Sequence, residues 1–168
     1  MAGTSLISRY LNAPLPSRSE QRRLPFRPEP QEIEALYRSL NKHIFENELT
    51  QPEIYMHSIK KCWGLCNWED VRQKRGSHGK RGTWCNIELS DKWFSPQWCV
   101  AVLAHEMVHQ YQWDIERFSN NGFNIHEYSG AHGPSFFAWK ARFAYWGIDL
   151  KTSYGIRRWF KHQDFHKC

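Results

Sequence analysis

The sequence predicts an α+β protein in which a small, mainly antiparallel sheet packs on helices. Three stretches carry apolar residues at helical spacing, and three shorter strand-like runs lie between the first two of these stretches. The chain has 168 residues, of which 40% are hydrophobic and 15% are aromatic. It is therefore long enough and apolar enough to form one core without disulfide or metal staples.

The first 30 residues differ in composition from the rest of the chain. They hold five of the eight prolines and five arginines, and they contain no apolar run long enough for a signal peptide or a membrane span. Residues 1–30 are therefore predicted to form an extended or disordered basic arm, and residues 31–168 a globular domain. No membrane partner is expected. The expected location is intracellular: cytoplasm, nucleus or a particle assembled there.

The first predicted helix and the sheet come next along the chain. An amphipathic helix is predicted over residues 31–48, where apolar residues recur with helical periodicity. Strands are predicted over residues 53–59, 63–69 and 83–89, which are short runs rich in aromatic and β-branched residues.

A central helix is predicted over residues 96–113. Ser95 supplies an N-cap and Pro96 a first-turn proline, and no glycine or proline interrupts the apolar run that follows. A later helix is predicted over residues 133–146. A Gly-Pro turn marks its start, and Gly147 marks its end.

The central helix contains the most informative segment of the chain, His105-Glu106-Met107-Val108-His109. Two histidines four residues apart project from one face of a helix, so both imidazoles can bind a single Zn²⁺. Glu106 then lies beside the ion, where it can take a proton from a bound water whose pKa the metal lowers to about 7. The segment predicts a zinc hydrolase. The simpler alternative is a buried helix whose two histidines are satisfied by hydrogen bonds.

A catalytic zinc site normally has three protein ligands and an open position for water, so a third ligand must lie downstream. The chain lacks the glycine and the third histidine with which the metzincin pattern continues, and that class is excluded. The candidates are the carboxylates of Glu116 and Glu127 and the imidazoles of His126 and His132. His132 precedes the Gly-Pro turn, and a rigid turn can hold a ligand in place.

The segment Ala131-His132-Gly133-Pro134-Ser135-Phe136 resembles the G-H-G-P-x-F-like segment of the SprT-like zinc metalloprotease family, which includes the Spartan-type proteases of DNA–protein crosslinks. The resemblance covers residues 29–160. It implies a zincin-like protease core in which His105, His109 and His132 bind one catalytic Zn²⁺ and Glu106 is the general base. His126 lies in a segment that looks like an inserted loop, and it is the alternative third ligand.

Positive charge is concentrated between the second and third predicted strands. The net charge of +6 favours an acidic partner. Five cations crowd one glycine-containing segment: Arg72, Lys74, Arg75, Lys80 and Arg81. This segment is predicted to hold a nucleic-acid backbone while the ring of Trp68 stacks on an unpaired base. A solvated polar loop is the alternative, and the association of the resembled family with DNA favours nucleic acid.

Together these observations predict a zinc metalloendopeptidase that cleaves polypeptides, including proteins associated with DNA. Two other classes fit the same residues: an assembly component that retains a zinc-bound metallopeptidase fold without catalysis, and a nucleic-acid-binding module that zinc stabilises. The intact Glu106 favours the enzyme, because neither alternative needs a general base beside the metal.

Overall fold

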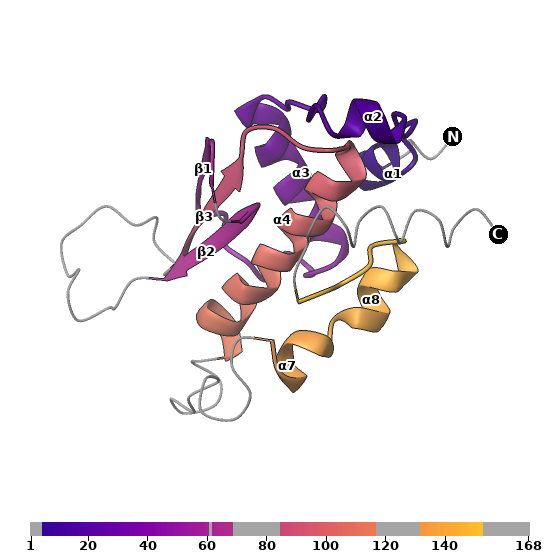
Figure 1. Ribbon diagram of the computed structural model, residues 1–168. Helices are drawn as coiled ribbons and strands as arrows, with labels where there is room; N and C mark the ends of the chain where they lie inside the picture. The colour runs from indigo at the N-terminus through magenta and orange to yellow at the C-terminus, as the bar shows by residue number, and fades with distance from the viewer. Residues whose placement is uncertain (1–4, 61, 69–84, 117–131, 153–168) are drawn as a thin grey trace.

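A central helix separates a small sheet from the C-terminal helices in the computed structural model, which describes residues 5–60, 62–68, 85–116 and 132–152. Figure 1 shows this helix, α4 (Pro96–Tyr111), with the sheet on one side. On its other side lie α7 (Pro134–Phe137) and α8 (Lys140–Tyr145). The α+β class predicted from the sequence is confirmed.

The sheet is mixed, so the prediction of a mainly antiparallel sheet is wrong. Its strands are β1 (Glu53–His57), β2 (Gly64–Trp68) and β3 (Cys85–Ser90), in the order β1-β3-β2. β2 pairs with β3 in the antiparallel sense, whereas β1 pairs with β3 in parallel. The consecutive strands β1 and β2 therefore lie at opposite edges instead of forming a hairpin, an arrangement that alternating side chains do not reveal.

α4 begins at the predicted residue because of its cap. The Ser95 hydroxyl accepts a hydrogen bond from the backbone N–H of Trp98 at 3.3 Å, and Pro96 occupies the first turn. The helix ends at Tyr111 and continues into a turn of π-helix, η1 (Gln112–Glu116). Residues 98 to 108 of α4 are all buried, so this helix is the centre of the core. No helix in the described part of the chain has the length and apolar character needed to cross a membrane.

The N-terminal residues pack on the domain, and the prediction of an extended or disordered arm is wrong for residues 5–30. Two short helices form there: α1 (Leu6–Leu11) and α2 (Arg18–Gln21). Ile7 on α1 is fully buried in the core. The Gln97 side-chain amide on α4 donates a hydrogen bond to the backbone carbonyl of Ala13 at 2.6 Å. The apolar face of α1 is too short for periodicity analysis to detect among prolines and arginines.

The first long helix, α3 (Pro30–His43), ends before the predicted residue 48. The amide of Asn41 explains the early stop, because it donates to the carbonyl of Leu49 at 2.7 Å and accepts from the N–H of Leu49 at 3.2 Å. Glu46 and Asn47, which lie between Asn41 and Leu49, have positive φ angles, and a right-handed helix does not accommodate such angles. The chain therefore turns sharply here and enters β1.

The helix predicted over residues 133–146 is divided into α7 and α8. The break lies at residues 138 and 139, and the ring of Trp139 there packs on Phe45, with 4.6 Å between ring centroids. Phe143 of α8 is fully buried against the same phenylalanine. These contacts attach the C-terminal helices, which lie on the side of α4 away from the sheet, to the turn that follows α3.

Replacement of Ile7 by alanine tests the packing of the N-terminal segment. The loss of a fully buried side chain should lower the free energy of unfolding by about 2–4 kcal/mol. Leu15→Ala is the matched control, because Leu15 is 48% exposed in the same segment and its truncation should cost less than about 1 kcal/mol. Chemical denaturation measures both values. Equal, small effects of the two substitutions would contradict the structure.

Candidate metal centre

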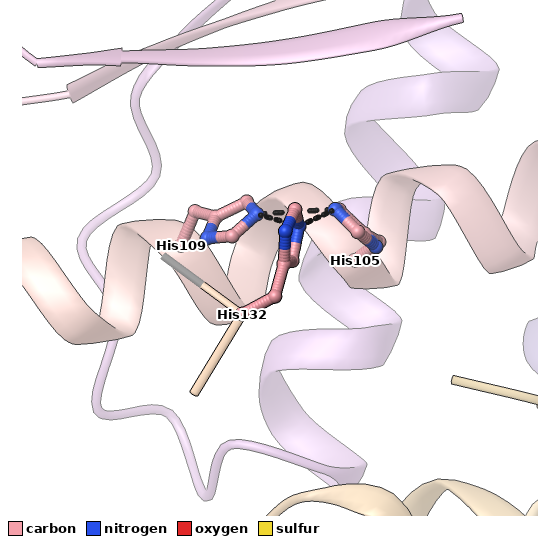
Figure 2. A group of neighbouring side chains, drawn as sticks. All are labelled: His105, His109 and His132. Carbon is pink, nitrogen blue, oxygen red and sulfur yellow. Dashed lines mark hydrogen bonds between the residues drawn. The ribbon is translucent and has the colours of Figure 1, made fainter. Parts of the chain in front are cut away.

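Three histidine side chains converge at the C-terminal half of α4. The Nε2 atoms of His105 and His109 lie 3.0 Å apart, and the Nε2 atom of His132 lies 3.2 Å from each of them. Figure 2 shows the rings of His105 and His109 facing each other along α4, with the His132 ring between them. Among the described residues, these three form the group of side chains that can hold a metal ion.

The opposite nitrogens of the two α4 rings are occupied by hydrogen bonds. Nδ1 of His105 lies 2.7 Å from the backbone carbonyl oxygen of Lys151, and Nδ1 of His109 lies 2.9 Å from Oε1 of Gln112. Both partners are acceptors, so each Nδ1 carries the proton. A neutral imidazole has one N–H, and Nε2 of both rings therefore presents a lone pair to the cluster.

The surroundings favour the neutral form of the His105 and His132 rings. Burial and the neighbouring His109 and His132 rings lower the pKa of His105 to about 3, against the opposing effect of the Lys151 carbonyl. Burial also lowers the pKa of His132. Unprotonated nitrogens so close together repel each other, and a cation between them removes that repulsion. The separations approach the value of about 3.3 Å expected between nitrogens in a tetrahedral site with 2.0–2.1 Å bonds. The three residues fit a transition-metal ion.

Phe136 on α7 holds the three rings from one side. Its own side chain is fully buried. Its ring centroid lies 4.8 Å from those of His105 and His132 and 5.1 Å from that of His109, to which it is nearly parallel. This packing restricts rotation of the imidazoles and keeps water from one side of the cluster.

Glu106 follows the first histidine and is buried against β2. The pKa of Glu106 is raised to about 8 by burial, although a hydrogen bond from the backbone N–H of Cys66 opposes the rise. The side chain fits because residue 64 is glycine: a Cβ atom there would lie 3.0 Å from Cγ of Glu106 and 2.8 Å from Cγ1 of Val102. The missing side chain of Gly64 thus lets β2 approach α4 at the glutamate.

The structure brings together part of the predicted site. His105, Glu106 and His109 lie on α4, and His132 lies on the turn before α7. Glu116, a candidate third ligand, lies on η1, where it hydrogen-bonds to Ser135 and is not a member of the histidine cluster.

Several predicted residues, or their side chains, lie outside the described part of the chain. Trp68 is the last residue of β2, and its side chain lies outside the described residues. The same holds for the remaining candidates: Arg72, Lys74, Arg75, Lys80, Arg81, His126 and Glu127.

Sequence reasoning missed the residues that orient the ligands. Gln112 carried a signal, because three residues after His109 is the spacing of neighbours on a helix. Phe136 matches the phenylalanine of the G-H-G-P-x-F-like segment, but the sequence pattern does not indicate what this side chain does. The carbonyl of Lys151 gave no signal, since any residue type supplies a carbonyl and only the fold brings this one to His105.

A glutamate between two helix histidines, with a third histidine on a following turn, is the arrangement of a metallopeptidase-like domain. Comparison with protein families agrees, because the model of the SprT-like family matches residues 33–155. The match covers most of the chain, and this protein belongs to the SprT-like family, as the resemblance predicted. A search of curated proteins found no match to the chain.

Replacement of Glu106 by glutamine should change the pH dependence of stability in the metal-free protein. The pKa of Glu106 is about 8 in the folded state, against 4.5 for an ordinary glutamate, so folding retains a proton that the unfolded chain loses. Wild-type protein should therefore lose stability relative to Glu106→Gln as pH rises from 4.5 to about 8, by about 1.4 kcal/mol per pKa unit as an upper limit.

Chemical denaturation of the chelator-treated proteins at both ends of this range measures the difference. A bound divalent cation should reduce it, because positive charge favours the carboxylate. The same stability difference at both pH values would contradict the buried, protonated state of Glu106.

Proposed function

We propose that this protein is a zinc-dependent metalloendopeptidase. The proposal rests on one observation: three imidazole Nε2 atoms converge on α4 next to a buried glutamate, in a chain of the SprT-like family. Three protein ligands with one open position are typical of catalytic zinc, whereas structural zinc normally has four. Zinc is the metal that we propose, because neutral imidazole suits it.

His105, His109 and His132 would hold the ion. When bound, zinc would supply Lewis acidity, activating a water molecule and stabilising negative charge on the scissile carbonyl oxygen. The acceptors on Lys151 and Gln112 hold the proton of each neutral α4 ring on Nδ1, so its Nε2 atom is the one left to bind the ion.

Glu106 would be the general base and then the general acid. Its burial raises its pKa to about 8, so without a cation the group exchanges its proton near neutral pH. We propose that it takes a proton from the attacking water and transfers it to the amine that leaves. The backbone of β2 supports this role, because the N–H of Cys66 and the open space at Gly64 determine where the carboxyl group lies.

The proposed substrates are polypeptides, including proteins on nucleic acid. The basic segment with Arg72, Lys74, Arg75, Lys80 and Arg81 suggests this second part, which stays a prediction from the sequence. The two alternatives, a non-catalytic assembly component with a zinc-bound fold and a nucleic-acid-binding module stabilised by zinc, need zinc but no Glu106.

Two substitutions separate the enzyme from these alternatives. Glu106→Gln should retain one zinc per chain and lose cleavage of an unfolded protein substrate, and of the chain itself, by at least about 100-fold. His132→Ala should lose both zinc and cleavage, because two histidines alone bind the ion weakly. Metal analysis and gel-based cleavage assays with and without DNA measure these outcomes. A wild-type protein that binds zinc yet behaves like Glu106→Gln in every assay would refute the peptidase.

Gly64→Ala should impair the proposed base without removing the metal. The added methyl group would push against Cγ of Glu106 and against Val102, which belongs to the rigid core helix. We expect kcat to fall about 10- to 100-fold, since small displacements of a catalytic group have effects of this size. Zinc content should be unchanged. Leu65→Ala is the matched control, because Leu65 is 41% exposed on the same strand; equal kcat values for the two variants would refute this role of Gly64.

A further inference from the structure

Gln112 connects one proposed ligand, His109, to the segment that carries another, His132, through its side-chain amide. It lies on η1, three residues after His109, and is only 3% exposed. Its Oε1 atom accepts the hydrogen bond from Nδ1 of His109 at 2.9 Å, and its Nε2 atom donates to the hydroxyl of Ser135 at 2.8 Å. Ser135 is three residues after His132, so the amide joins the helix ligands to the turn that carries the third ligand.

The hydrogen bonds continue to a carboxylate. Ser135 accepts from Gln112, which leaves its own hydrogen free, and its hydroxyl hydrogen-bonds to the half-buried Glu116. Every donor in the series points the same way, from His109 through Gln112 and Ser135 to Glu116. Bonds aligned in this sense polarise one another.

We propose that Gln112 is a positioning residue of the metal centre, which fixes His109 in the Nδ1–H tautomer and ties α4 to the turn that carries His132. A hydrogen bond from the outer nitrogen of a metal-binding histidine fixes the tautomer of the ring. It also makes the inner nitrogen a stronger ligand for the metal. The inference depends on the proposed function only in taking zinc as the metal, and it concerns zinc binding rather than peptide cleavage.

A glutamine suits this place because it accepts on one atom and donates on the other. Leucine of similar size would remove the amide oxygen that accepts from His109 and the amide N–H that donates to Ser135, and it would allow His109 to place its proton on Nε2, towards the metal. The tautomer of His105 does not depend on a side chain in this way. Its Nδ1 proton is hydrogen-bonded to the backbone carbonyl of Lys151, which no side-chain replacement removes.

The test measures the affinity of the whole chain for Zn²⁺ by competition with a chelator. Gln112→Leu should bind zinc about 10- to 100-fold more weakly than wild type. Gln112→Glu should restore much of that loss, because its carboxylate again accepts from His109. Substitution of Co²⁺ for zinc gives a second measurement, since the visible absorption of Co²⁺ should change in Gln112→Leu if the orientation of His109 changes.

The matched control is Gln110→Leu. Gln110 is a fully buried amide near the end of α4, and it bonds to Tyr37, Thr50 and Asp114 instead of to a ligand. Its replacement should lower the free energy of unfolding without the change in the Co²⁺ spectrum. Wild-type zinc affinity in Gln112→Leu, or equal losses in Gln110→Leu and Gln112→Leu, would overturn the inference while leaving the proposed function intact. Absence of zinc binding in the wild-type chain would overturn both.

Discussion

Repulsion between imidazole nitrogens that lack protons is the physical constraint on which the structure around α4 depends. Nε2 of His105 and Nε2 of His109 lie 3.0 Å apart, and hydrogen bonds at Nδ1 prevent either ring from relieving the repulsion by moving its proton inwards. Such an arrangement persists only where the surroundings hold it or where a cation occupies it. The ring of Phe136, the Lys151 carbonyl and the Gln112 amide supply that support from three separate segments of the chain.

The burial of α4 affects both the stability of the fold and the ionisation of Glu106. Its apolar residues form the centre of the core, which fixes the backbone from which His105 and His109 project. The same burial removes water from Glu106 and raises its pKa to about 8. A helix on the surface would present the same residue pattern, but its glutamate would keep an ordinary pKa and would ionise fully at neutral pH. The position of the helix within the core therefore sets the ionisation of this carboxyl group.

Local patterns predicted what depends on local interactions. The cap at Ser95 and Pro96 identified the start of α4, and helical spacing placed His105 and His109 on one face. His132 required more than spacing, because Glu116, His126 and Glu127 were also within reach along the chain, and it was the rigid Gly-Pro turn and the resemblance that favoured His132. The parallel pairing of β1 and the packing of Ile7 depend on contacts between distant segments, which a sequence pattern does not encode.

The cluster also acts as a cross-link within the chain. His109 and His132 are 23 residues apart, and the His105 ring bonds to a carbonyl 46 residues further along the chain. An ion held by all three rings would close the first of these loops, with a gain in stability similar in kind to that from a disulfide. The segment with α7 and α8 would then owe part of its attachment to the metal. Chelation would loosen that segment first, so metal supply would determine how much of the chain is folded.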